Sequence, residues 1–369
     1  MRRAASTSEP RRRVAPAVLA IALALAGGCS REEPVRMERL YVFGTLADVE
    51  IRGAEPAQSR AALAEVSGLL NQRQSEWHAW EPSDLTRINA ALAAGESAVA
   101  PASVVELIAR SRPLAEASEG LFDPAVGGLV AAWGFHTSTF PVLAAPPGEA
   151  WLQRWREMRP RLDQVRLEGD VVSSSNPAVQ LDFGAIAEGL ASETILEVLE
   201  RHGIRHALVS LGGDIVALGD GNGRPWRVGL KDPFGGVLGS VQLDDHEALF
   251  STGNYNKFRE SPTGARWGHV LDPRTGRPAR GAAAVVVLHR DPVLADASAT
   301  ALFVAGPAGF DRTTRRLGLG CVLMVTEENE MLVTVAMAAR VELLRNPVSL
   351  GPPLDLGPDC DGRAPAAAD

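Results

Sequence analysis

Asp296 and Thr300 form the pair whose residue types and spacing most directly suggest metal chemistry. They lie four residues apart in an apolar run, so a helix would place both side chains on one face. A carboxylate, a hydroxyl and a backbone carbonyl are hard oxygen ligands that suit Mg2+, which keeps water ligands and gains phosphate oxygens from a substrate. The same spacing also fits a structural role, in which Asp296 caps the helix and Thr300 packs inside.

His269 stands at the end of an expected strand, shortly before an Asp-Pro-Arg-Thr-Gly turn at 272–276. A histidine of near-neutral pKa could take a proton from a hydroxyl nucleophile. Arg274 and Arg277 could offset the charge of a phosphate. Taken alone, His269 is also compatible with a structural role.

Two glycine-containing turns could bring the backbone close to a ligand. The segment 182–189 leads from a strand end into a helix, where free N–H groups suit phosphate. Helix capping by Asp182 explains the same pattern. The second turn, Gly212-Gly213-Asp214, follows an apolar strand and equally fits a tight hairpin.

The elements that must position these residues are read from hydrophobic periodicity. Residues 40–51 predict a strand pair or a bent strand around Gly44. Helices are expected at 57–72, 101–117, 151–158, 188–202 and 295–306, and further strands at 207–211, 215–218, 226–230, 237–243, 248–252 and 283–288. Their irregular mixture favours an α+β fold of mainly antiparallel sheets with packed helices.

The composition is that of a globular protein, with 46% hydrophobic and 22% charged residues. A net charge of -8 and the lack of a basic cluster in the body argue against nucleic acid as a partner.

The N-terminus has the pattern of an export signal, with arginines before a short apolar run at 14–26. Small residues then precede Cys29, as in a lipobox, so residues 1–28 are predicted as a lipoprotein signal peptide and Cys29 as the lipidated residue; a plain secretory signal is the alternative. Residues 29–39 are expected to be a tether, 40–345 the functional domain and 346–369 a disordered tail. Cys321 and Cys360 could form one disulfide, and no function is assigned to them.

Together and in this order, these features resemble the ApbE family of FAD:protein FMN transferases. The resemblance begins at Tyr41-Val42-Phe43-Gly44-Thr45 and covers the body from about Leu40 to Val325. It continues through Pro82-Ser83-Asp84-Leu85-Thr86-Arg87-Ile88-Asn89, Gly120-Leu121-Phe122-Asp123-Pro124-Ala125-Val126-Gly127 and Trp133-Gly134-Phe135 before the four features above.

The resemblance implies a T-fold-like architecture, with FAD in a cleft between two intimate lobes and Mg2+ at its pyrophosphate. Asp296 and Thr300 match side-chain metal ligands, Ala185 matches a backbone-oxygen ligand, and His269 matches the residue that activates the acceptor hydroxyl. Positions lining the FAD site are matched by Leu121, Phe122, Asp123, Asp182, Glu188 and Leu271. Two departures concern the rings of FAD: Phe43 replaces a usual Met, and Trp80 stands one residue out of register with an expected aromatic.

The activity implied is cleavage of FAD, attachment of FMN to Thr or Ser of an exported flavoprotein with a Ser/Thr-Gly-Ala-Ser/Thr motif, and release of AMP. The enzyme would sit lipid-anchored on the periplasmic side of a bacterial membrane, with the inner membrane expected. Alternatives are an FAD pyrophosphatase that uses water, a non-catalytic flavin-binding lipoprotein, and a periplasmic solute-binding lipoprotein, although the strand-rich second half disfavours the last.

Overall fold

The structure is a computed structural model that describes residues 35–143, 145–254, 257–261, 263–345 and 349–361. The predicted signal peptide and Cys29 lie outside the described residues. The helices are α2 (Pro56–Trp77), α3 (Asp84–Ala93), α4 (Ala102–Ala117), α5 (Gly127–Ala132), α6 (Glu149–Met158), α7 (Ala187–Arg201), α8 (Pro292–Arg316) and α9 (Val335–Arg340), with a 3-10 turn at Leu162–Gln164.

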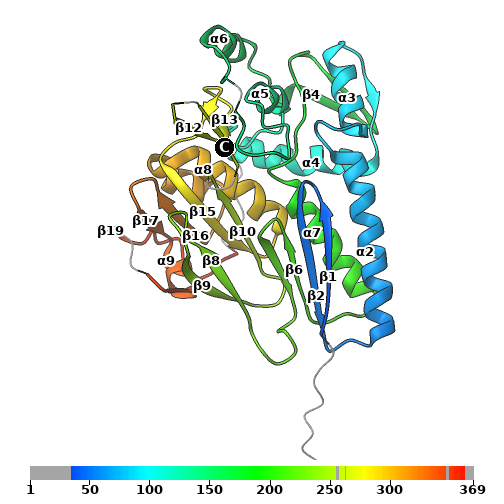
Figure 1. The fold of residues 1–369 in the computed structure, drawn as a ribbon, viewed down its shortest axis with the longest axis vertical. Coiled ribbons are helices and arrows are strands. Elements are labelled where there is room, and N and C mark those ends of the chain that lie inside the picture. Colours follow the sequence, from blue (N-terminus) through cyan, green and yellow to red (C-terminus); the bar gives the residue numbers. More distant parts are fainter. Residues whose placement is uncertain (1–34, 144, 255–256, 262, 346–348, 362–369) are drawn as a thin grey trace, which may run out of the picture. The chain divides into compact units, whose positions relative to one another are not determined.

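A nine-stranded sheet runs through the body in the order β1-β2-β6-β7-β10-β15-β16-β17-β19 (Figure 1). All its neighbours are antiparallel except β17 and β19, which are parallel. Its strands are β1 (Val35–Val42), β2 (Thr45–Arg52), β6 (Ala207–Leu211), β7 (Asp214–Leu218), β10 (Ala248–Gly253), β15 (Ala282–His289), β16 (Cys321–Thr326), β17 (Glu330–Val333) and β19 (Ser349–Leu350). The predicted α+β class with mainly antiparallel sheets is therefore confirmed.

Four smaller sheets complete the strands of the described residues. They pair β18 (Val341–Leu343), β9 (Val237–Leu243) and β8 (Trp226–Lys231); β3 (Ala98–Val99), β5 (Val171–Ser174) and β4 (Val165–Glu168); β11 (Phe258–Glu260) with β12 (Arg266–Gly268); and β13 (Leu271–Asp272) with β14 (Arg277–Pro278).

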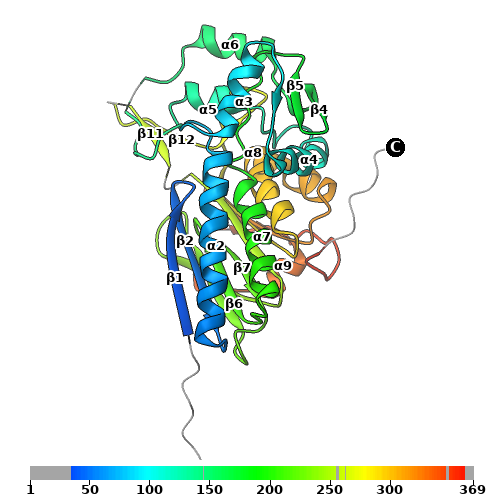
Figure 2. The same ribbon diagram turned by 90° about the vertical axis from the view of Figure 1, so that its right-hand side faces the viewer.

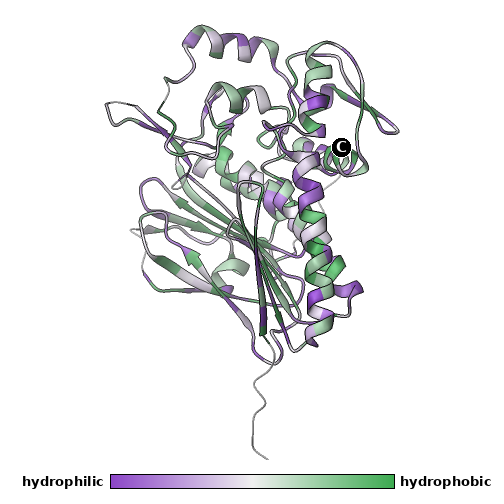
Figure 3. Ribbon diagram, turned by 45° about the vertical axis from the view of Figure 1, so that its right-hand side comes forward, coloured by the Kyte–Doolittle hydropathy of each residue, from purple (hydrophilic) through white to green (hydrophobic). Residues whose placement is uncertain are grey.

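Strand β15 shows why the large sheet has a core on each face. Successive side chains of a strand point to opposite faces. Val285 and Val287 belong to the cluster formed with the helices, whereas Val286 and Leu288 belong to the cluster formed with β8 and β9. The strands of this sheet are accordingly mostly green in Figure 3, whereas α2 alternates between purple and green along its length.

Helix α8 is long and apolar enough to cross a membrane, but 67% of its apolar window is buried inside the body, as in the core helix of a globular domain. Asp291 caps its N-terminus by accepting hydrogen bonds from the amides of Val293 and Leu294. The helix is interrupted at Gly306, whose φ of 63° and ψ of -174° are not helical, just before Pro307. The predicted helix 295–306 is therefore the first segment of α8.

Two predicted boundaries require correction. Strand β1 begins at Val35, inside the predicted tether 29–39, because Val35 to Val42 pairs along its whole length with β2. Figure 2 shows this hairpin beside α2. The body from Val35 onward groups as one compact unit.

The second correction concerns the predicted disordered tail, 346–369, of which residues 349–361 are packed. β19 pairs with β17, and the amide of Leu354 donates to the Val333 carbonyl at 2.9 Å. A disulfide joins Cys360 to the buried Cys321 on β16. The proline- and glycine-rich composition suggested disorder, but these bonds hold the segment on the sheet.

Candidate active site

Three acidic side chains meet where α7, α8 and the β6–β7 turn come together. Asp296 on α8 accepts a hydrogen bond at 2.9 Å from the amide of Gly189, in the first turn of α7. Glu188, the residue before Gly189, shares a hydrogen bond with Asp214 at the start of β7. The predicted candidates Glu188 and Asp296 therefore lie together. Asp214 lies beside them, although the sequence was equally compatible with a purely structural hairpin turn at this residue.

Close packing of small residues makes this meeting possible. A Cβ at Gly189 would lie 2.5 Å from the carbonyl oxygen of Pro292 on α8, so only glycine lets the two helices approach this closely. Gly212 has a φ of 64°, and a Cβ there would lie 2.8 Å from Glu188 Oε2. The glycines of the two predicted turns thus allow the carboxylates to converge.

Burial sets the electrostatics of this carboxylate cluster, defined as Glu188, Asp214 and Asp296. Burial raises the pKa of Glu188 to about 7, although the positive charge of Lys257 acts in the opposite direction. Burial and the charge of Glu188 raise the pKa of both Asp214 and Asp296 well above the usual range. The three acidic groups of the cluster outnumber the one positive charge of Lys257, and this excess favours binding of a positively charged ligand.

Thr300 lies on α8 one turn beyond Asp296, and its Oγ1 is 3.3 Å from Thr252 Oγ1 on β10. Strand β10 is itself fixed to the cluster, because Asp214 Oδ1 accepts from the amide of Ser251 at 2.7 Å. Ala185 lies in the turn that leads to Glu188. Thr252 falls in the predicted strand 248–252 and was assigned no role from the sequence.

The donor set fits a magnesium ion. Asp296, Thr300 and the Ala185 carbonyl offer hard oxygen ligands, and the buried carboxylates supply negative charge. Within the described ranges, no three His, Cys, Asp or Glu side chains form a ready-made metal cage. Such a site would therefore depend on hydroxyl, carbonyl and substrate oxygens, as is usual for Mg2+ at phosphates.

His269 lies between the β12 and β13 strands, with its Nδ1 3.2 Å from the carbonyl oxygen of Lys257. Burial and the charge of Lys257 lower the pKa of His269 to about 4. The positive charge of Lys257 therefore acts on both His269 and Glu188. The imidazole is neutral at ordinary pH and can accept a proton.

Asp182 is held by three hydrogen bonds at the start of the turn 182–185. Its Oδ2 lies 2.9 Å from His136 Nε2, its Oδ1 accepts from the Gly184 amide at 2.9 Å, and its amide donates to the Pro124 carbonyl at 2.8 Å. Burial acts to raise the pKa of Asp182, but the hydrogen bond and charge of His136 outweigh it and lower that pKa. Asp182 therefore stays ionised, and sequence reasoning gave no role to His136.

The other predicted FAD-lining residues are mostly buried. Leu121 and Phe122 pack in the main core, and Leu271 packs in the cluster of Leu129, Trp133, Phe135 and Trp155. Asp123 binds the amides of Ala125 and Leu162 at 2.9 and 3.0 Å, and burial raises its pKa to about 6. These side chains leave little surface for a ligand in this structure.

The two aromatic departures occupy different surroundings. Phe43, in the β1–β2 turn, stacks on Trp77 with ring centroids 5.7 Å apart. Trp80 stacks on His136 at 5.3 Å, beside the Asp182 turn. Only Trp80 is thus joined to the site by a direct chain of contacts.

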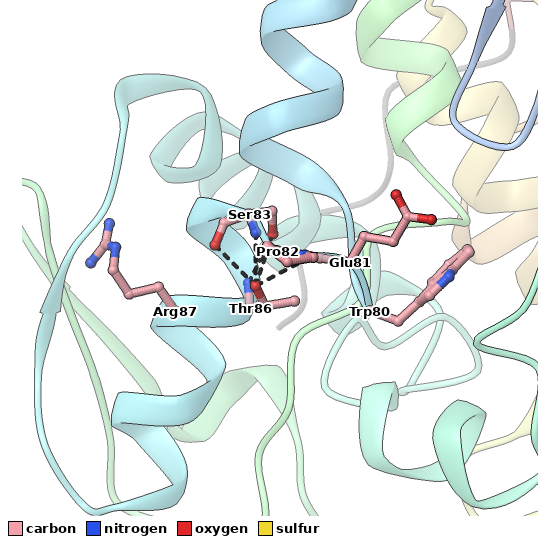
Figure 4. Close-up of a pocket in the computed structure, with 6 residues that line it drawn as sticks. All are labelled: Trp80, Glu81, Pro82, Ser83, Thr86 and Arg87. Carbon is pink, nitrogen blue, oxygen red and sulfur yellow. Dashed lines mark hydrogen bonds between the residues drawn. The ribbon is translucent and has the colours of Figure 1, made fainter.

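Trp80 also lines a surface pocket together with Glu81, Pro82, Ser83, Thr86 and Arg87 (Figure 4). Ser83 and Thr86 form the hydrogen-bonded cap of α3, with the Thr86 amide 3.0 Å from Ser83 Oγ. The side chains of Trp80 and Arg87 point in opposite directions in Figure 4. The two hydroxyl groups that line the pocket are therefore engaged in helix capping, and the carboxylate cluster is not part of the pocket.

Arg274 and Arg277 each pair with a carboxylate that does not belong to the cluster. Arg274 pairs with Asp272 at 2.9 Å, and Arg277 pairs with Glu149. Their guanidinium groups are engaged by these carboxylates, and a role in offsetting phosphate charge stays a prediction.

The comparison with known proteins decides the family. The model of the ApbE family matches residues 43–323. This chain belongs to the ApbE family. The resemblance predicted from the motifs is thereby confirmed.

Curated relatives of this ApbE-family chain are named FAD:protein FMN transferase. The one from Rhodobacter capsulatus is 43% identical over 88% of this chain, which spans 62% of that relative's length. The one from Treponema pallidum is 34% identical over 78% of this chain and 84% of its own length.

Solved structures of the family share the fold. A flavinyl transferase ApbE from Pseudomonas stutzeri, in its apo form, has a TM-score of 0.72 and 28% identity, covering 84% of this chain and 97% of its own. The ApbE protein of Thermotoga maritima has a TM-score of 0.74 and 26% identity, covering 84% of this chain and 100% of its own.

Proposed function

We propose that this chain is a Mg2+-dependent FAD:protein FMN transferase, which cleaves FAD, attaches FMN through a phosphoester to Thr or Ser of an acceptor flavoprotein and releases AMP. Membership of the ApbE family and the names of its curated relatives support the activity. The observation that carries the proposal for this chain is the meeting of Glu188, Asp214 and Asp296 at the start of α7, with Thr300 one turn farther along α8 than Asp296.

Asp296, Thr300 and the Ala185 carbonyl would hold the metal. When bound, Mg2+ supplies charge neutralisation at pyrophosphate oxygens. The amides that open α7 lie at the end of the 182–185 turn, where the N-terminus of a helix favours an anion.

His269 would act as the general base. Its low pKa keeps it neutral, so it can accept the proton of an acceptor hydroxyl as the oxygen attacks the FMN phosphorus. The P–O bond to the AMP half breaks, and AMP leaves with the displaced oxygen. If water takes the place of the hydroxyl, the same groups would produce free FMN and AMP.

The deciding experiment incubates the full chain in detergent with FAD, Mg2+ and an exported flavoprotein domain that carries a Ser/Thr-Gly-Ala-Ser/Thr motif. Intact-protein mass spectrometry then weighs the acceptor. A mass gain of one FMN unit that EDTA abolishes, and that an acceptor with Val at the modified Thr does not show, supports the transferase. Free FMN and AMP without the mass gain would instead favour the pyrophosphatase, and absence of both products a flavin-binding lipoprotein.

The chain is further proposed to be anchored through a lipid on Cys29, on the periplasmic side of a bacterial membrane. The small residues before Cys29 support this, since they match a lipobox. The Cys29→Ser variant should lose lipid labelling and leave the membrane fraction. Retention of both in the variant would refute the anchor.

A further inference from the structure

His136 occupies a position between two parts of the candidate active site. It follows α5 in the loop that contains Trp133, Gly134 and Phe135. One nitrogen of its ring lies 2.9 Å from the Asp182 carboxylate, and the ring itself stacks on Trp80 with centroids 5.3 Å apart and planes inclined by 19°. His136 thus joins an aromatic face to an ionised carboxylate.

The Asp182 side of this contact leads directly to the metal-binding groups. The carboxylate of Asp182 also holds the Gly184 amide, which shapes the turn that presents Ala185. At the other end of the same segment, the Gly189 amide is bound by Asp296. The segment 182–189 is therefore fixed at its two ends, by His136 through Asp182 and by Asp296.

The Trp80 side presents a partly open aromatic surface. Trp80 is 38% exposed, and its ring also meets the edge of His78 at 4.3 Å between centroids. Planar rings of this kind stack on one another through offset π-faces. The indole is thereby held by two histidines while Trp80 as a whole remains 38% exposed.

The residue before His136 makes a third contact. The ring of Phe135 meets the His269 ring edge-on, with centroids 6.4 Å apart and an interplanar angle of 81°. Two consecutive residues of one loop therefore touch the general base and the Asp182 turn. A displacement of this loop would therefore shift both His269 and the turn that begins at Asp182.

We propose that His136 is a positioning residue that couples the aromatic face of Trp80 to the 182–189 segment, so that binding of a ring of FAD on Trp80 and placement of its pyrophosphate at Ala185 occur together. This inference rests on the proposed function. His136 acts through Asp182 and Trp80, and its proton is held by a carboxylate, so it is not assigned a step in the chemistry.

The test measures FAD affinity by calorimetry in EDTA, where no turnover occurs, together with KM and kcat for FAD in Mg2+. His136→Ala should weaken FAD binding about tenfold, which corresponds to the loss of about one well-formed interaction to a charged group. KM should rise by a similar factor while kcat changes less, since no group that moves a proton is removed. His136→Gln, which retains an N–H donor for Asp182, should recover most of the affinity.

A matched control is His246→Ala, since His246 is paired with Glu200 at 3.0 Å on the outer face of α7 and should leave FAD affinity unchanged. Combining His136→Ala with Trp80→Ala should cost less than the sum of the two single changes, because both residues belong to one unit. Wild-type affinity in His136→Ala, or equal losses in the Ala and Gln variants, would overturn the coupling through Asp182. Failure of the unmodified chain to bind FAD would overturn the proposed function, and this inference with it.

Discussion

The hydroxyl oxygens of Thr252 and Thr300 lie 3.3 Å apart, which joins strand β10 to the middle of the first segment of α8. Thr252→Val should raise the Mg2+ concentration for half-maximal turnover by about tenfold, because loss of a residue that orients a metal ligand typically has this effect. Thr252→Ser keeps the hydroxyl and should behave like the unmodified protein. A metal titration of turnover distinguishes them, and identical curves for Val and Ser would show that Thr300 needs no such partner.

Asp296→Asn separates charge from packing at the carboxylate cluster. The amide oxygen of Asn can still accept from Gly189, so the fold should be kept, while metal-dependent turnover should fall by about a hundredfold or more. Thermal unfolding without metal should show equal or greater stability in the variant, since one of three mutually repelling buried acids becomes neutral. Full turnover of the variant at ordinary Mg2+ would remove Asp296 from the metal site.

The helices and strands were largely predictable, whereas the contacts between distant segments were not. Hydrophobic periodicity located α4 (Ala102–Ala117) and α7 (Ala187–Arg201) to within a residue at each end, because burial of one helix face imposes the pattern on the sequence itself. Nothing local relates His136 to Asp182, which is 46 residues away in sequence, so their pairing appears only in three dimensions.

The packing of residues 349–361 was also not predictable from the local sequence. Its composition lacks the periodicity of a helix or strand, since short bridges and a disulfide hold it instead of a continuous apolar face. Glu188 and Asp296, which the motif resemblance assigns to the FAD and metal sites, lie close together in the fold, whereas the place of Asp214 beside them shows only in three dimensions.

The pH profile should report the environment of His269. Because burial and Lys257 lower its pKa to about 4, the imidazole is already neutral above about pH 5. At saturating Mg2+, which keeps the carboxylate cluster ionised, the rate of FMN transfer should therefore stay level as the pH is lowered through 6.5 and fall only toward pH 4, whereas His269→Ala should be inactive throughout. An acidic limb near 6.5, the value of a solvated histidine, would contradict the burial of His269.

Asp123→Asn should change the pH dependence of stability. Burial raises the pKa of Asp123 from 3.8 to about 6, so the folded protein holds the proton more tightly than the unfolded chain does. The contribution of protonated Asp123 to the free energy of unfolding is therefore fully present below about pH 4 and is lost as the pH rises through about 6. The Asn variant lacks this loss, so its stability relative to the unmodified protein should increase by about 3 kcal/mol across that interval.

Denaturant titrations at several pH values check this prediction, because the Asn oxygen can still accept from Ala125 and Leu162. Calorimetry on the same variant tests the assignment of Asp123 to FAD binding. Parallel stability curves for the two proteins would mean that the carboxylate is more hydrated than its burial indicates.

Cys360→Ser should destabilise the body through loss of the bond to Cys321. The disulfide closes a loop of 39 residues, for which the chain-entropy relation gives about 4 kcal/mol. The variant should melt at a lower temperature and should no longer respond to dithiothreitol, which lowers the melting temperature of the unmodified protein. Equal melting temperatures with and without reductant in the unmodified protein would show that the noncovalent contacts of residues 349–361 suffice.

The close contact between Gly189 and Pro292 restricts which substitutions this enzyme can accept during evolution. The amide that binds Asp296 belongs to the residue that allows α7 and α8 to touch, so one position serves both the architecture and the chemistry. A mutation that inserts even a methyl group there would separate the helices and move Asp296, the proposed metal ligand, away from the amide that it binds. Selection on helix packing and selection on the position of Asp296 are thus inseparable at this residue, and the carboxylate cluster can change only as far as the contact between α7 and α8 permits.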